Sequence, residues 1–359
     1  MTHPLLSPLP LPNGQVAPNR IWLAPMTNQQ SHADGRLSED ELHWLERRAA
    51  GGFGVIETCA THVAADGQGW PGELGIFDDR HAQGWGQLVA AVQAHGAWLV
   101  PQLFHGGARA RGDLTGSTPI TTVDSADGSA RAATDDDLRR VVARFRDAAA
   151  RAMTAGADGV EIHGAHGYLP CQFLSTTLNT REDAWGGDLA GRARLLREIT
   201  RAVREVVPAD RMLCVRLSPE DFGQLTGLDL GESVQVARWL VDDGMDVLHL
   251  SLWDALAPSR QRPDVHPVAP FRSALPADVP IVVAGNVWSR ADAEFCLDAG
   301  ADAVALGRSA ITTPDWPRTV ARDGAAPVRP PVTREHLRAA GLGEAFVDYM
   351  ARWDGFVSA

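Results

Sequence analysis

The stretch VEIHGAHGYL, residues 160–169, brings side chains that can do chemistry into one short turn. His163 and His166 are three residues apart, Tyr168 follows two residues later, and two glycines lie between them. Two imidazoles can hold one substrate oxygen by hydrogen bonds, and a phenol can give a proton to a neighbouring atom. Structural histidines and a metal site are the alternatives, although a metal needs a third ligand that is not obvious in the sequence. The turn predicts a substrate-binding pair with a proton donor.

Apolar runs of strand length alternate with helical patterns eight times along the chain. The expected strands cover residues 20–26, 54–60, 97–103, 158–163, 211–217, 246–251, 280–286 and 302–307. They are nearly continuously hydrophobic, which is typical of parallel strands buried on both faces. Between them, apolar residues recur every three to four positions, and several of these stretches end at glycine. The pattern predicts an α/β chain folded as a (β/α)₈ TIM barrel. A doubly wound sheet is weaker because no G-x-G-x-x-G motif is present.

Three segments fall outside the eightfold pattern. Residues 1–18 are rich in proline, and we expect them to close the bottom of the barrel. Residues 104–134 form a long polar loop after the third strand, on the side where we expect the active site. Residues 325–359 form a C-terminal extension that ends in a short helix. No domain boundary is visible, so residues 1–359 are expected to form one domain.

Active sites of such barrels lie at the carboxyl ends of the strands. The side chains expected there include few that ionise near neutral pH and no carboxylate pair, which disfavours glycosidase and two-metal hydrolase chemistry. They are Pro25, Met26, Thr27, Thr58, Cys59, Ala60, Gln102, His163, His166, Arg216, Ser251, Gly285, Asn286, Gly307 and Arg308.

The last two strand ends carry a phosphate-site pattern. Gly285 and Asn286 follow the seventh strand, and Gly307 and Arg308 follow the eighth. Small residues and helix starts at these two loops often hold a phosphate, although a plain tight turn is the alternative. Arg216, at the end of the fifth strand, offers a fixed positive charge to a cofactor that becomes anionic, unless it forms an outward salt bridge.

Composition limits the partners. With 33 basic and 45 acidic residues the net charge is -12 and no basic stripe is present, so nucleic acid and anionic membrane surfaces are disfavoured. Every basic residue counted is arginine, which excludes a lysine Schiff base. The four cysteines are far apart and are expected to be buried free thiols. Without a membrane span or a signal-peptide pattern, we expect a cytoplasmic protein.

Taken together, these motifs resemble the old yellow enzyme family, FMN-dependent ene-reductases built on a (β/α)₈ barrel. The matching stretches run from about residue 19 to 317 and include NRIWLAPMTN, GVIETCATHV, PQLFHGGAR, VEIHGAHGYLPCQFLS, VRLSPED, IVVAGNV and ADAVALGRSAITTPDWP. The resemblance implies that NADPH or NADH reduces bound FMN. The flavin then gives hydride to the beta carbon of electron-poor alkenes, namely α,β-unsaturated carbonyl or nitro compounds.

The resemblance also implies cofactor roles, which we carry over residue by residue. Thr27 is expected to hydrogen-bond the flavin, Gln102 to bind its pyrimidine edge, and Arg216 to sit near N1 and O2 and stabilise the reduced form. The isoalloxazine is expected to be lined by Pro25, Met26, Thr27 and Ala60, and the phosphate to be held by Gly285, Asn286, Gly307 and Arg308.

On the substrate side, the resemblance implies that His163 and His166 bind the activating oxygen and that Tyr168 protonates the alpha carbon. Phe104 and Thr27 are expected to border the substrate pocket. Thr27 stands where one branch of the family has a redox-tuning cysteine, and Asn28 stands where arginine is more usual. These departures bear on substrate preference more than on flavin binding.

The sequence leaves several functional points open. A flavin-free, phosphate-binding barrel isomerase or lyase is the alternative function, and a flavin protein used for sensing or electron delivery is another. The sequence does not separate NADH from NADPH or identify the physiological alkene. It also leaves open whether the chain forms homo-oligomers, and whether Arg352 in the C-terminal helix reaches a neighbouring active site.

Overall fold

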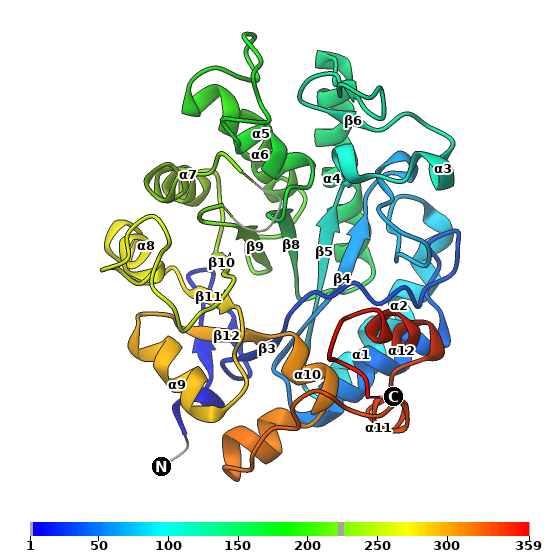
Figure 1. Ribbon diagram of the computed structural model, residues 1–359, viewed down its shortest axis with the longest axis vertical. Helices are drawn as coiled ribbons and strands as arrows, with labels where there is room; N and C mark the ends of the chain where they lie inside the picture. The colour runs from blue at the N-terminus through cyan, green and yellow to red at the C-terminus, as the bar shows by residue number, and fades with distance from the viewer. Residues whose placement is uncertain (1–2, 222–225, 359) are drawn as a thin grey trace.

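The computed structural model describes residues 3–221 and 226–358. Its centre is a closed barrel of parallel strands in the order β10-β11-β12-β3-β4-β5-β8-β9 (Figure 1). The strands are β3 (Ile21–Leu23), β4 (Val55–His62), β5 (Trp98–Phe104), β8 (Gly159–Gly164), β9 (Met212–Leu217), β10 (Val247–Ser251), β11 (Ile281–Ala284) and β12 (Ala303–Leu306). Each strand pairs with the next along the chain, and β12 closes on β3. The predicted (β/α)₈ barrel is confirmed, with a strand at each expected position.

Helices alternate with these strands and cover the outside of the barrel (Figure 1). They are α1 (Glu39–Gly51), α2 (Ala82–Gln93), α4 (Asp135–Thr154), α5 (Leu169–Leu174), α6 (Leu189–Arg204), α7 (Leu230–Asp242), α8 (Val268–Ala274), α9 (Arg290–Asp298) and α10 (Arg308–Thr312). Ser38 caps α1 by accepting a hydrogen bond from the Glu41 amide, as its position in the sequence predicts. The pattern did not predict α5, α8 and α10, because each spans fewer than eight residues and shows no repeated apolar stripe.

The interior of the barrel is apolar at its amino-terminal end. Alternate residues of the strands point inward there and form one buried cluster with side chains of the first 17 residues. Leu9 and Ala17 belong to this cluster and lie in a two-stranded hairpin of β1 (Leu9–Pro10) and β2 (Val16–Ala17). These contacts support our proposal that the N-terminal segment closes the barrel bottom; residues 1 and 2 lie outside the described part of the chain.

Strand β4 carries an irregularity that matters for the site. Its pairing with β5 shifts between Glu57, opposite Val100, and Ala60, opposite Gln102. In a regular strand, residues 57 and 60 point to opposite faces. The extra residue in β4 lets Glu57 join the polar interior while Ala60 joins a cluster with Trp70 and Phe104.

The two other segments outside the eightfold pattern are structured. Between β5 and α4 lie α3 (Gly112–Thr115) and a pair of short strands, β6 (Ile120–Thr121) and β7 (Arg131–Ala132). The C-terminal extension contains α11 (Arg334–Ala339) and α12 (Glu344–Ala351), beside α1 in Figure 1. The rings of Trp44 and Phe346 meet edge to face at 4.9 Å and join α12 to α1.

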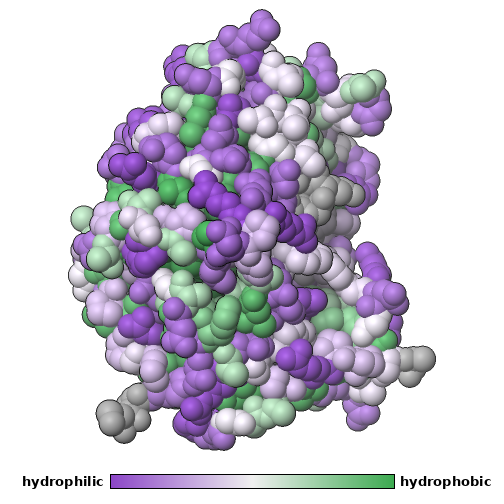
Figure 2. Space-filling view, turned by 60° about the vertical axis from the view of Figure 1, so that its left-hand side comes forward, coloured by the Kyte–Doolittle hydropathy of each residue, from purple (hydrophilic) through white to green (hydrophobic). Residues whose placement is uncertain are grey.

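The outer surface mixes residue types. Hydrophilic and hydrophobic residues are interspersed over the face in Figure 2. Among residues 3–221 and 226–358, no helix has both the length and the apolar character needed to cross a bilayer. All four cysteines are buried and free, as predicted.

Replacing Leu9 by alanine tests the barrel closure. Leu9 is 3% exposed, so the variant leaves a cavity beneath the barrel, and we expect a loss of about 3 kcal/mol in the free energy of unfolding. Val16→Ala on the partner strand is the matched control, because Val16 is 52% exposed and its truncation should cost less than about 0.5 kcal/mol. Urea unfolding of the two variants measures both values; equal losses would contradict the closure.

Candidate active site

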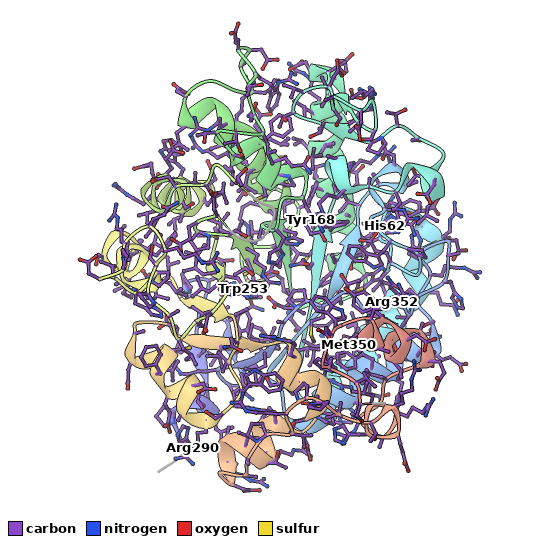
Figure 3. The ribbon with its side chains drawn as sticks, viewed as in Figure 1. His62, Tyr168, Trp253, Arg290, Met350 and Arg352 are labelled. Atoms are coloured by element: carbon purple, nitrogen blue, oxygen red, sulfur yellow. The ribbon has the colours of Figure 1, made fainter. Side chains whose placement is uncertain are left out.

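The turn after β8 brings the predicted substrate-binding residues together. His163 lies in β8, His166 in the turn, and Tyr168 at the N-cap of α5. The Tyr168 ring is 4.5 Å from that of Phe104 and 5.1 Å from that of His163, measured between centroids. His166 has a φ of 60°, a left-handed conformation that non-glycine residues adopt mainly under local constraint. Tyr168 lies near the centre of the barrel in Figure 3.

A hydrogen-bond chain fixes the tautomer of His166. Arg216 Nη2 donates to Ser251 Oγ at 3.1 Å, and Ser251 Oγ lies 2.6 Å from His166 Nε2. A guanidinium can only donate, and no other acceptor for the Ser251 hydroxyl proton appears among the described residues. We therefore assign that proton to the bond with His166 Nε2, which places the ring proton of His166 on Nδ1.

The proton on His166 Nδ1 points toward the second histidine. His166 Nδ1 and His163 Nε2 are 3.2 Å apart, and His163 Nδ1 has no hydrogen-bond partner among the described residues. At this distance the two nitrogens hydrogen-bond each other, with His166 Nδ1 as the donor and His163 Nε2 as the acceptor. The two nitrogens predicted to bind the activating oxygen therefore lie side by side, and their role toward a substrate stays a prediction.

Both imidazoles are neutral in the resting site. Burial lowers the pKa of His163 and of His166 well below the ordinary value, and the nearby positive charge of Arg216 lowers both further. Burial also raises the pKa of Tyr168, so its phenol keeps its proton at neutral pH. The site therefore offers neutral hydrogen-bond donors and one protonated phenol.

Arg216 and Gln102 stand on neighbouring parts of the barrel mouth. Arg216 is 5% exposed, faces Ser251 and forms no ion pair within 4.0 Å among the described residues, which rules out the outward salt bridge. Its Nε has no hydrogen-bond partner there either. A buried guanidinium with an unused N–H needs an acceptor, and an electron-rich ring edge supplies one. Gln102 is also buried and donates through Nε2 to Glu161 at 2.6 Å.

The ends of β11 and β12 meet at a small-residue loop. Gly285 has a φ of 151°, and an added Cβ would lie 2.4 Å from the Leu252 carbonyl oxygen, so only glycine fits. Asn286 Oδ1 accepts from Arg308 Nη2 at 3.2 Å. A Cβ on Gly307 would lie 3.5 Å from the Met26 sulfur, which places Met26 beside this loop. Pro25 and Thr27 flank Met26 in the half-buried segment after β3.

Sequence reasoning missed two contributors to the site, Trp70 and Arg109. The ring of Trp70 lies 5.4 Å from that of Phe104, and Arg109 stacks its guanidinium 4.5 Å from the centre of the Tyr168 ring. Arg109 Nη1 also donates to the His166 carbonyl at 2.7 Å. Both residues follow barrel strands at their carboxyl ends, which is the one signal that could have found them. Ser251 was on the list of strand ends, but only its contacts reveal its role.

A cavity of about 340 Å³ opens beside this turn. It is lined by Arg109, His166, Gly167 and Gln172, together with Thr121 and Thr122 of the 104–134 segment. The long segment after the third barrel strand therefore forms one wall of a cavity that His166 reaches.

Comparison with known proteins agrees with this geometry. A family model described as "NADH:flavin oxidoreductase / NADH oxidase family" matches residues 4–325. The chain belongs to this family. A probable NADH-dependent flavin oxidoreductase of Bacillus subtilis is 34% identical over 328 residues, which cover 87% of this chain and 86% of that protein. An NADPH dehydrogenase of Bacillus licheniformis is 33% identical over 89% of this chain and 94% of that protein.

Solved structures of family members share the fold. The old yellow enzyme homologue from Zymomonas mobilis has a TM-score of 0.81 and 28% identity, over 96% of this chain and 99% of that one. Morphinone reductase in complex with tetrahydroNAD has a TM-score of 0.82 and 29% identity, over 97% of each chain. The resemblance to old yellow enzymes is confirmed. The chain is an FMN-dependent NAD(P)H oxidoreductase, and the flavin-free isomerase or lyase is ruled out.

Some members of this family are longer. An NADH:fumarate oxidoreductase of Klebsiella pneumoniae is 33% identical over 88% of this chain, but this chain spans 36% of its length. An NADH:acrylate oxidoreductase of Vibrio harveyi is 30% identical over 85% of this chain, which spans 32% of its length.

The residues present fit FMN. The unused N–H of Arg216 suits the electron-rich edge of a flavin, and the Gly285–Asn286 and Gly307–Arg308 turns place an exposed arginine beside two small-residue loops, which suits a phosphate. Met26 and Ala60 supply apolar surface next to these groups. Assignment of each residue to a part of the cofactor stays a prediction.

Arg308→Ala tests the phosphate assignment. The variant removes one charge from the exposed end of the site, and we expect the dissociation constant for FMN to rise about tenfold or more. Riboflavin, which lacks the phosphate, should bind both proteins equally. Arg290→Ala on α9 is the matched control and should bind FMN normally. Fluorescence titration gives the constants; an equal loss for riboflavin argues against a phosphate contact.

Proposed function

We propose that this oxidoreductase reduces alkenes conjugated to a carbonyl or nitro group. The observation that carries the proposal is the pair of neutral imidazole nitrogens 3.2 Å apart, with the Tyr168 phenol on the same turn. Bound FMN supplies the hydride chemistry, with electrons from NADPH or NADH. The protein residues then bind the alkene, polarise it and supply a proton.

His163 and His166 act on the activating oxygen of the substrate. Hydrogen bonds from His163 Nε2 and His166 Nδ1 withdraw charge from that oxygen and make the beta carbon electrophilic. The assigned tautomer of His166 supports this role, because Ser251 occupies Nε2 and leaves the donor proton on Nδ1, where a substrate oxygen takes it over from His163 Nε2 on binding. Both rings are neutral, so they stabilise growing negative charge without first losing a proton.

Tyr168 supplies the proton to the alpha carbon. Its ring contacts the rings of Phe104 and His163. The guanidinium of Arg109 lies over the Tyr168 ring, 4.5 Å from its centre, so the phenol is held in place by three neighbours. The positive charge of Arg109 lowers the pKa of Tyr168, against the larger effect of burial. That influence makes the phenol a better acid when a substrate carbon needs its proton.

The charge of Arg109 suggests that the substrates include alkenes with a carboxylate group. It is exposed, borders the cavity beside His166 and forms no ion pair within 4.0 Å among the described residues. A carboxylate on the alkene could pair with it. The names of the fumarate and acrylate oxidoreductases make unsaturated carboxylates worth testing beside enones.

A second candidate function is electron delivery. The match to about one third of two longer oxidoreductases is the observation that favours it. In that case NAD(P)H reduces the flavin rapidly while enones, nitroalkenes, fumarate and acrylate all leave it reduced.

Tyr168→Phe separates these steps. Without the phenol, we expect turnover of cyclohexenone to fall about 100-fold or more, whereas reduction of the flavin by NADPH keeps its rate. Tyr349→Phe, on α12, removes the other of the two phenols in the chain; because Tyr349 acts on the pKa of Tyr168 as a minor cause, we expect a much smaller change in turnover. Anaerobic stopped-flow absorbance of the flavin follows both half-reactions. Full cyclohexenone turnover in Tyr168→Phe would remove Tyr168 from the mechanism.

Ser251→Ala tests the tautomer assignment. Losing the hydroxyl frees His166 Nε2 and leaves the proton of His166 without a fixed position. We expect KM for cyclohexenone to rise about tenfold, with FMN still bound. Steady-state kinetics on the flavin-loaded variant measures this, and an unchanged KM contradicts the chain from Arg216 to His166.

A further inference from the structure

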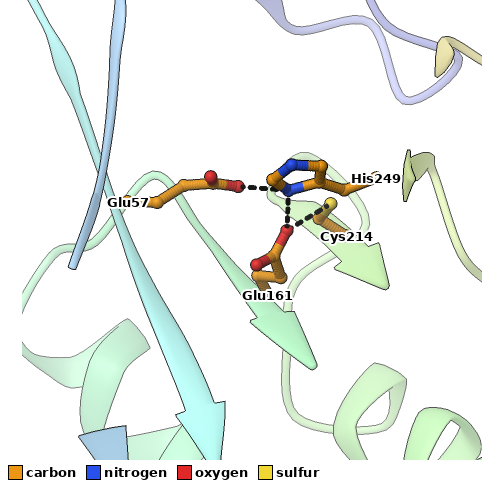
Figure 4. Close-up of side chains that lie close together, drawn as sticks. All are labelled: Glu57, Glu161, Cys214 and His249. Atoms are coloured by element: carbon orange, nitrogen blue, oxygen red, sulfur yellow. Dashed lines mark hydrogen bonds and ion pairs between the residues drawn. The ribbon is translucent and has the colours of Figure 1, made fainter. Parts of the chain in front are cut away.

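A layer of ionisable side chains lies inside the barrel, two residues along the strands from the candidate site toward their amino-terminal ends. Glu161 is two residues before His163, and His249 is two residues before Ser251, each on the same strand. Alternate residues share a face, so both point into the barrel beneath the site. Glu57 joins them from β4 (Figure 4). All three side chains are at most 1% exposed.

Glu161 is held as a carboxylate by several donors. Its two oxygens accept from Gln102 Nε2 at 2.6 Å, from His249 Nδ1 at 2.7 Å and from Cys214 Sγ at 3.2 Å. Burial alone would raise the pKa of Glu161, but the charges of His249 and Arg216 and the hydrogen bond from His249 lower it below the ordinary value. Glu161 is therefore ionised and His249 is its cationic partner.

Glu57 lies on the other side of the same imidazole. Its Oε1 is 3.3 Å from His249 Nδ1, and neither of its oxygens has a hydrogen-bond partner among the described residues. A single N–H cannot serve two carboxylates well, and His249 Nδ1 lies closer to Glu161. Burial and the charge of Glu161 raise the pKa of Glu57 to about 8. At neutral pH Glu57 holds a proton, and the three residues together carry no net charge.

The three residues connect to the flavin side through two predicted cofactor contacts. Glu161 only accepts, so Gln102 must turn its amide nitrogen toward Glu161 and keep its carbonyl oxygen for a ligand N–H. Arg216 acts electrostatically on both Glu161 and His249. A charge placed beside Arg216 or Gln102 therefore changes the electrostatic potential at Glu161 and His249.

The same side chains also have a spacing that a metal ion could use. The ligand atoms of Glu57, Glu161, Cys214 and His249 lie within 4.8 Å of one another. Glu161 Oε2, His249 Nδ1 and Cys214 Sγ are already joined by hydrogen bonds, and the positive charge of Arg216 acts on the layer. These facts favour protons over a metal cation.

We propose that Glu57, His249 and Glu161 form a buried triad whose protonation depends on the charge of the flavin. In this proposal Glu57 takes up a proton when the flavin is reduced in alkaline solution. The triad residues are positioning residues that act through Gln102 and Arg216. The proposal rests on the FMN cofactor of the family and not on alkene reduction.

Reduction of the flavin and protonation of Glu57 are linked, and the sign of this linkage follows from charge. Reduction adds negative charge to the site, which opposes the ionised form of Glu57 and raises its pKa further. Below about pH 8 Glu57 is protonated in both redox states and nothing changes. Above that pH, reduction draws one proton from solvent to a Glu57 oxygen, while NAD(P)H or dithionite supplies the two electrons. The titratable groups that face Glu57 in the described interior are His249, Glu161 and the thiol of Cys214, with the charge of Arg216 beyond them.

The test is the midpoint potential of the bound flavin between pH 6 and pH 10, measured with dithionite and a reference dye. In the wild-type protein we expect the potential to fall about twice as steeply with pH above about pH 8 as below it, because one proton per two electrons becomes two. Glu57→Gln, which copies the protonated form, should give a straight line. No alkene is used, so failure of the proposed alkene reduction leaves this result unaffected.

Asp158→Asn is the matched control. Asp158 precedes β8 at the opposite end of the barrel, accepts from the Leu99 amide at 2.9 Å, and also has a pKa raised by burial. This variant should keep the wild-type break near pH 8. A break that persists in Glu57→Gln, or a straight line for the wild-type protein, overturns the proposal.

Two further measurements cover other outcomes. If Glu57→Gln does not fold, redox-difference infrared spectra of the wild-type protein at pH 9 should show a carboxylic acid band gained on reduction, and its absence overturns the proposal. Elemental analysis of the wild-type protein and of His249→Gln tests for a metal. One metal ion per chain that is lost in His249→Gln shows that the cluster is a metal site and overturns the proton triad.

Discussion

A closed parallel barrel sends every second side chain of each strand into an interior that holds little water, so each charge placed there needs a partner. This protein meets the constraint in layers. The lower layer is apolar and includes Met212 and Val247. The next layer holds Glu161 and His249, which neutralise each other. The upper layer carries Arg216, whose unused N–H suits an electron-rich ligand. The layers explain why we expect the cofactor contacts at one end of the barrel.

The layering also connects the cofactor side to the substrate side. Arg216 donates to Ser251, Ser251 donates to His166, and His166 faces His163. Because the chain begins at a group that can only donate, the direction of each later bond follows from it. One buried guanidinium therefore fixes the tautomer of His166 and, in our proposal, also faces the edge of the flavin.

The family membership and the pocket decide different properties. FMN and a nicotinamide reductant come with the family, since the model covers residues 4–325 and the relatives named as NADPH dehydrogenases span nearly their whole length. We expect substrate choice to depend on the residues over the turn, namely Phe104, Trp70 and Arg109. Arg109 in particular places a positive charge beside the phenol that we propose as the acid. Loops tolerate such variation because the strands beneath them hold the backbone.

The barrel and the ends of its strands could be predicted from the sequence, and so could the candidate site residues at those ends, because buried parallel strands and active-site ends have a regular spacing. His163, His166, Tyr168, Arg216, Gly285 and Arg308 all followed from that spacing or from the resemblance that it supported. Tertiary structure alone decided the rest. The shift in β4 brings Ala60 to the same face as Glu57, and only closure of the barrel brings His249 between Glu57 and Glu161, which are 104 residues apart in the chain (161 minus 57). Local periodicity cannot show such contacts, because a register shift reverses the face of a side chain and long-range pairing leaves no local pattern.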